Sequence, residues 1–187
     1  PALCEYAFSA EADLPLDLQW LRTPAPERIW SLDARPGWLR LFARESIGSW
    51  FEQALVARRQ QHFVYRAETE LEFAPQNFQQ AAGLTAYYNR HKFFAVALTW
   101  DESAGRSLIV FGCAGDYPDG RLTFFAEPVP VGPGPVRLAA SVDHARLQFA
   151  YASTDADWRD IGPALDASLL SDEAGGGEHR SFTGAFV

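Results

Sequence analysis

Residues 60–89, QQHFVYRAETELEFAPQNFQQAAGLTAYYN, decide the fold that this sequence predicts. Within them, His62–Phe73 alternates between apolar residues on one face and an arginine with three glutamates on the other. A period of two sustained over a whole strand is typical of a sheet with one dry and one solvated face. The proline and two polar residues of Pro75–Asn77 then end the run.

The second half of this stretch predicts another strand, Gln79–Asn89, which carries almost no charge. Its large side chains are Leu84, Tyr87 and Tyr88. A strand this apolar is expected to be covered on both faces, because solvent on one face would favour polar residues there. We therefore expect this strand to lie in the centre of its sheet.

The rest of the chain consists of short strand candidates separated by glycine and proline turns, without an amphipathic helix. The clearest is a hairpin of Val136–Asp143 and Arg146–Ser153, with every second side chain of the latter facing inward. About a dozen short strands predict an all-β fold, an antiparallel two-sheet β-sandwich, and favour a jelly roll over an immunoglobulin fold. We expect one sandwich domain over residues 16–187 after a leading segment, 1–15.

Composition limits the function classes. The 187 residues carry a formal net charge of −8, so the surface repels phosphate backbones and predicts no nucleic-acid partner. No apolar run has the length of a membrane span, and no signal peptide opens the chain. Cys4 and Cys113 are expected to be free, with Cys113 buried, which favours a reducing compartment such as the cytoplasm but leaves localisation open.

The two ends suggest a piece of a longer protein. The sequence contains no methionine and stops inside the apolar run Gly184–Val187, which is expected to be a strand. We therefore expect the domain to be truncated before its closing strand.

Three glutamates, Glu68, Glu70 and Glu72, are the strongest candidates for chemistry, because residues two apart on a strand point to the same side. Neighbouring carboxylates of the row lie roughly 7 Å apart, a spacing that suits glycoside hydrolysis. The row loosely resembles the acidic strand of lectin-like jelly-roll glycosidases, with Glu70 where that motif has aspartate. The alternative is a solvated outer face, since Arg66 lies on the same side.

Metal and cofactor signals are weak, and we expect neither. Asp155, Asp157 and Asp160 surround Trp158 in a way that suggests a calcium loop, but the pattern of backbone ligands is missing; a turn with Trp158 in the core is the alternative. The four histidines show no ligand spacing, and no phosphate-binding loop or serine elbow is present.

Five runs of sequence, in order, are similar to one known domain. They resemble the C-terminal β-sandwich, of concanavalin A-like fold, in the β-xylosidases and α-L-arabinofuranosidases of glycoside hydrolase family 43. The likeness extends from about Leu16 to Val187. The runs are LFARES (41–46), LVARRQQHF (55–63), FQQAAGL with YYN (78–84 and 87–89), TWDE (99–102) and FTGAFV (182–187).

The resemblance implies a supporting role. In that family the sandwich follows a five-bladed β-propeller, which carries the catalytic carboxylates and is absent from this sequence. The sandwich contacts the propeller, and one of its loop aromatics reaches the rim of the substrate pocket. The matching position here is Phe182; an apolar rim excludes water and limits the pocket to one or two sugar units.

Three functions remain open. The first is a non-catalytic accessory domain of a family 43 glycosidase acting on xylo-oligosaccharides or arabinosides, inactive alone and able to form a homo-oligomer through its uncovered face. The second is a free-standing carbohydrate-binding module, which titration with xylan would reveal. The third is a jelly-roll glycosidase using Glu68 and Glu72.

Overall fold

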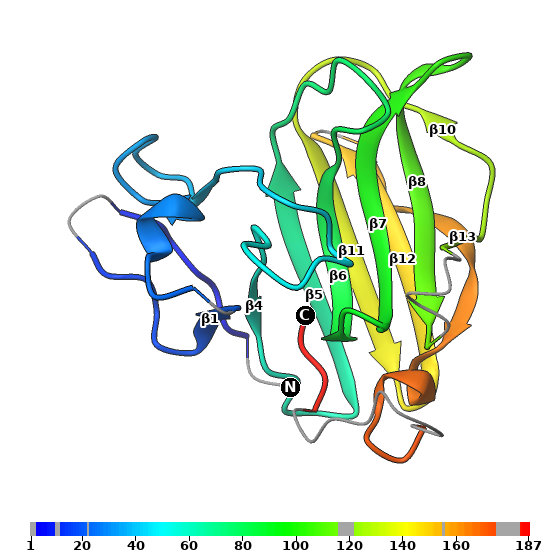
Figure 1. Ribbon diagram of the computed structural model, residues 1–187. Coiled ribbons are helices and arrows are strands. Elements are labelled where there is room, and N and C mark those ends of the chain that lie inside the picture. Colours follow the sequence, from blue (N-terminus) through cyan, green and yellow to red (C-terminus); the bar gives the residue numbers. More distant parts are fainter. Residues whose placement is uncertain (1–2, 10–11, 22, 116–121, 155, 175–183) are drawn as a thin grey trace. The chain divides into compact units, whose positions relative to one another are not determined.

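A computed structural model describes residues 3–9, 12–21, 23–115, 122–154, 156–174 and 184–187 (Figure 1). The chain divides into two compact units, Pro1–Arg59 and Gln60–Val187. The predicted domain boundary after residue 15 stays a prediction. The described sheets are built from antiparallel ladders, which confirms the predicted fold class.

The first unit is made of short elements. Strand β1 (Leu18–Trp20) pairs with β4 (Val56–Arg58), and β2 (Trp30–Ser31) pairs with β3 (Arg40–Leu41). A 3-10 turn, η1 (Pro26–Arg28), begins at a proline, whose fixed φ suits the first helical position.

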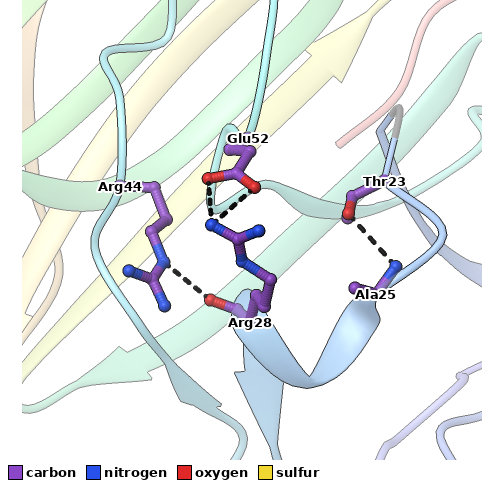
Figure 2. Close-up of polar contacts among 5 residues, drawn as sticks. All are labelled: Thr23, Ala25, Arg28, Arg44 and Glu52. Carbon is purple, nitrogen blue, oxygen red and sulfur yellow. Dashed lines mark hydrogen bonds and ion pairs between the residues drawn. The ribbon is translucent and has the colours of Figure 1, made fainter.

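Polar contacts to the backbone fix the loops of this unit (Figure 2). The Arg28 guanidinium lies 2.9 Å from the Glu52 carboxylate, and the Arg44 Nε donates to the Arg28 carbonyl over 2.9 Å. The Thr23 hydroxyl accepts from the amide of Ala25 just before η1. The Arg44 and Thr23 side chains thus supply hydrogen-bond partners to backbone groups that the short strands leave unpaired.

The second unit is a sandwich of two sheets, stacked face to face in Figure 1. One sheet has the order β10-β8-β7-β6, with β9 also paired to β8, and the other has the order β13-β12-β11-β5. The strands are β5 (Val64–Leu71), β6 (Ala82–Asn89), β7 (Lys92–Asp101), β8 (Gly105–Ala114), β9 (Thr123–Phe124), β10 (Val129–Pro130), β11 (Val136–Asp143), β12 (Arg146–Ser153) and β13 (Arg159–Asp166).

The core lies between these sheets and contains apolar side chains from both. Leu98, Leu108, Leu138 and Phe149 have no solvent exposure. Burying a side chain of this size stabilises the fold by about 1.5–3 kcal/mol, so this layer is the main favourable contribution in the unit. The second 3-10 turn, η2 (Ala167–Leu170), adds Leu170 to the same cluster.

The alternation predicted for β5 is confirmed over most of its length. Tyr65, Leu71 and Phe73 contact the core, while the glutamates between them are exposed. Phe63, expected on the dry face, is 77 % exposed. It precedes the first residue of the strand, beyond the end of the sheet's paired region.

The prediction that the second strand of the opening stretch is central was wrong. β6 has β7 as its ladder partner, and among the described residues its other edge has a single bridge, from Tyr87 to Phe186. The strand covered on both faces is β7, whose first eight residues are all buried. Both strands are apolar, but β7 has a partner along each edge, whereas the first half of β6 is partly exposed.

The predicted hairpin is confirmed residue by residue. β11 and β12 pair from Val136↔Ser153 to Asp143↔Arg146, and His144 occupies the turn with φ 55°. Beyond it, β13 continues through Gly162 and Pro163. These two residues lie on a sheet edge, where a bulge accommodates Gly162 at φ +68° and proline is tolerated.

Candidate functional site

Phe182, the residue predicted to reach a substrate pocket, lies outside the described residues. The described residues on either side of it, up to Ala174 and from Gly184 on, show where its segment is attached to the sandwich. Both attachments are made near the C-terminal end of β6, at the consecutive residues Tyr87 and Tyr88.

The first attachment is a hydrogen bond in which the Tyr88 hydroxyl donates to the Asp172 carboxylate. The second is a two-way backbone bridge: the Tyr87 amide donates to the Phe186 carbonyl over 2.8 Å, and the Phe186 amide donates to the Tyr87 carbonyl over 2.7 Å. Tyr87 and Tyr88 are both buried. The end of β6 therefore fixes the chain before and after the segment that contains Phe182.

The last residues of the sequence make further contacts within the second unit, to which they belong. The Ala185 carbonyl accepts from the Gln60 amide over 2.9 Å, and the side chains of Ala185 and Val187 contact the core. Gly184 has φ +69°, a conformation that glycine adopts without steric cost. The predicted final strand is thus present as a bridge at Phe186; its residues 181–183 lie outside the described residues.

A buried basic cluster lies directly after the two tyrosines, at the turn between β6 and β7. Arg90, His91 and Lys92 are each at most 6 % exposed. The His91 amide donates to the Asn89 side chain over 2.8 Å, and the Arg90 Nε lies 3.0 Å from the His91 Nε2. The turn that sequence identifies as polar is therefore a packed, hydrogen-bonded structure rather than a solvated one.

Lys92 connects this turn to the tyrosine that binds Asp172. Its Nζ lies 5.3 Å from the centroid of the Tyr88 ring and has no hydrogen-bond partner among the residues that the structure describes. A buried ammonium without such a partner is costly, and the aromatic face is the favourable contact that it makes. The Tyr88 ring thus contacts the Lys92 side chain with its face, and its hydroxyl donates a hydrogen bond to the Asp172 carboxylate.

The glutamate row of β5 lies on the solvated face of the four-stranded sheet. Glu68, Glu70 and Glu72 are all exposed. The Glu68 carboxylate lies 2.5 Å from the Arg66 Nε. A glycosidase needs two carboxylates that face one bound sugar, whereas these carboxylates lie on an open, exposed sheet face beside an arginine. This arrangement is typical of a solvated sheet surface and does not support a pair of catalytic carboxylates.

Trp158 lies on this same outer face, so its predicted place in the core was wrong. The guanidinium of Arg66 lies 4.6 Å from its ring centroid and that of Arg137 lies 5.1 Å away. Ala139 on β11 is the cross-strand partner of Glu68 and therefore lies on the same outer face. It is nevertheless fully buried, so this part of the face is covered. Arg66 on β5 and Arg137 on β11 hold the indole on the sheet, where it is half-buried.

Metal-binding side chains do not gather anywhere in the described part of the chain, where no group of three or more such residues is found. Asp157 and Asp160 are exposed, and Asp155 lies outside the described residues. Cys4 is free and exposed and Cys113 is free and buried, as predicted. Among the described residues, no helix has the length and apolar character needed to cross a membrane.

A sandwich of two antiparallel sheets, with its C-terminal residues fixed on β6, is the class of domain that the fold defines. The sequence model described as "Beta xylosidase C-terminal Concanavalin A-like domain" matches residues 5–187. The chain belongs to this family, the C-terminal concanavalin A-like domains of glycoside hydrolase family 43 β-xylosidases. The family assignment made from the five sequence runs is confirmed.

Similar proteins support the assignment. The chain is 48% identical to "Xylosidase/arabinosidase 43B" of Humicola insolens, over 98% of this chain and 34% of that protein. It is 40% identical to a "Putative beta-xylosidase" of Escherichia coli K12, over 94% of this chain and 33% of that protein. The crystal structure of a xylan β-1,4-xylosidase from Bacillus halodurans superposes with a TM-score of 0.86 at 33% identity, covering 100% of this chain and 37% of that one.

The chain thus spans about a third of the length of the relatives that it matches.

Proposed function

We propose that this chain is the accessory sandwich of a family 43 glycosidase that hydrolyses xylo-oligosaccharides or arabinosides. The sandwich contacts a catalytic β-propeller of the same polypeptide and places Phe182 at the rim of its substrate pocket. The observation that carries the proposal is the family match over residues 5–187 in a chain that covers a third of its relatives.

The attachments of the Phe182 segment support the rim role. Asp172 and Phe186 are fixed at Tyr88 and Tyr87, so the backbone enters and leaves the segment at one end of β6. Anchoring of this kind reduces the conformational entropy that ordering a loop over a substrate would cost. The chemistry itself is assigned to the propeller, since the exposed Glu68 and Glu72 offer no suitable acid.

The test compares Phe182→Ala with Phe63→Ala in the polypeptide that contains the propeller, using xylobiose and an aryl xyloside as substrates. Phe63 is the matched control, because it is an exposed phenylalanine of the same unit. Loss of an apolar rim contact is expected to lower kcat/KM about tenfold, whereas Phe63→Ala leaves it unchanged. Equal rates for both variants would contradict the rim role.

The accessory role is tested separately by deleting the whole sandwich. Removal is expected to yield an insoluble or inactive propeller, because a face that the sandwich covers becomes exposed. A deletion variant with full activity and solubility would contradict the proposal. For the sandwich alone, the same reasoning predicts self-association through the uncovered face, which sedimentation velocity measures.

A further inference from the structure

A hollow of about 530 Å³ lies beside the five-stranded sheet, lined by residues from the end of β7, from β8 and from the segment that contains β9. Its floor includes Thr99 and Ile109, which alternate with core-facing residues of β7 and β8. Three aromatic residues lining it are substantially exposed: Phe78 (64 %), Trp100 (40 %) and Phe124 (61 %). Exposed rings that gather in one concave place mark a binding surface more strongly than rings scattered singly.

Neighbouring contacts hold Phe124 and Trp100 in place. The Phe124 ring contacts Phe111 at a centroid distance of 6.1 Å, and their backbones pair between β8 and β9. Trp100 packs over Gly105, the first residue of β8, which has φ +74° directly after the tight turn. These two rings are therefore presented by paired strands and not by long loops.

The segment that carries Phe78 is tied to the floor of the hollow. The Thr99 hydroxyl donates to the Gln80 carbonyl over 2.9 Å. Thr99 itself is 5 % exposed, so this contact is shielded from solvent. The backbone that carries the third ring is thus tied to β7, which lowers the conformational entropy lost when a ligand binds.

The charged side chains of the hollow are two carboxylates, those of Asp101 and Glu127, which accept hydrogen bonds. One oxygen of Asp101 accepts from the Ser103 hydroxyl (2.7 Å) and from the amides of Ser103 (2.9 Å) and Ala104 (2.7 Å). These hydrogen bonds, that of the Ser103 side chain first, hold the pKa of Asp101 below its ordinary value. Glu127 is a second, exposed carboxylate, and none of the described lining residues is basic. Phosphates, uronates and other anions are therefore unsuitable ligands.

We propose that this hollow binds a neutral oligosaccharide of pyranose units. The C–H faces of the sugar rings lie on Phe78 and Phe124, Trp100 borders the hollow, and the sugar hydroxyls donate to Asp101 and Glu127. A ligand with apolar faces and hydroxyl edges matches flat aromatic rings bordered by carboxylates. The site goes beyond the proposed accessory role, because it lies on the sandwich itself and requires no propeller residue.

The experiment titrates the chain with xylohexaose and cellohexaose, followed by NMR through the Trp100 indole resonance, which is assigned with Trp100→Phe. A shallow site of this kind predicts a Kd on the order of 1 mM. Phe124→Ala is expected to raise that Kd about tenfold, and Glu127→Gln severalfold, whereas Phe63→Ala leaves it unchanged. Phe124 and Glu127 are exposed, so these variants should remain folded, which their thermal unfolding verifies.

Several results would overturn the proposal. One is the absence of any shift at about 10 mM of either oligosaccharide, ten times the expected Kd. Another is an equal loss of binding in Phe63→Ala. A third is binding of tetramethylammonium but not of the sugars, because aromatic rings beside carboxylates also suit a quaternary ammonium ion. Self-association that Phe124→Ala abolishes, measured by sedimentation velocity, would also overturn it, because a second copy of the chain would then cover the hollow. None of these outcomes bears on hydrolysis by the propeller-containing polypeptide, so the proposed function is judged separately.

Discussion

Removing the Tyr88 hydroxyl should loosen the attachment of the chain that precedes Phe182. In Tyr88→Phe, the Asp172 carboxylate loses its donor while the buried ring and its contact with Lys92 remain. A hydrogen bond to a charged group contributes about 1.5–3 kcal/mol when buried. Asp172 is exposed, so water replaces the lost donor, and we expect a net cost of about 1 kcal/mol. For a chain of this size that corresponds to a Tm about 2–4 °C lower.

A double-mutant cycle of Tyr88→Phe with Asp172→Ala measures this contact by urea unfolding. The expected coupling free energy is about 1 kcal/mol. The matched control is a cycle of Tyr65→Phe with Asp172→Ala, since burial alone raises the pKa of Tyr65 and no hydrogen bond contributes. That control should give a coupling near zero. Equal couplings in the two cycles would refute the claim that Tyr88 anchors this segment.

Three further predictions concern the fold. Gly112→Ala places a Cβ 2.6 Å from the Phe93 carbonyl oxygen and should cost about 1–3 kcal/mol, whereas Gly132→Ala, with open space around it, should be close to neutral in the same urea unfolding experiment. Phe149→Ala should cost about 3–5 kcal/mol and Phe63→Ala less than about 0.5 kcal/mol; similar values would contradict the assigned core. Burial raises the pKa of Tyr65 from 10.0 to about 12. The unfolded chain therefore loses this proton first, stability falls between pH 10 and 12, and Tyr65→Phe should flatten that fall in Tm measurements, whereas an unchanged pH profile would contradict it.

Local alternation was sufficient to predict β5 and the β11–β12 hairpin. Each strand has one face on the core, so its side chains report their own burial. The same information could not distinguish β6 from β7, because both are apolar. β7 has a partner along each edge because β6 and β8 both pair with it, and composition does not record which strand is left at the edge of the sheet.

The candidate sites were predictable only in part. The alternation correctly placed Glu68 and Glu72 on one outward face. Whether their carboxylates could be catalytic depends on their surroundings, which are Arg66 and an open sheet surface. The aromatic hollow was missed, because Phe78 and Phe124 come from separate segments that only the folded sheet brings together. Trp100 continues the inward row of β7, yet it lies near the end of that strand and is partly exposed.

Hydrolysis by the chain alone tests the account most directly. Aryl β-xyloside and aryl α-L-arabinofuranoside are incubated with the purified chain, and release of the phenol is followed over hours. We predict a rate equal to that of the buffer, because the described residues provide no buried pair of carboxylates. Saturable turnover that disappears in Glu68→Gln or Glu72→Gln would contradict the account and assign the chemistry to the sandwich itself.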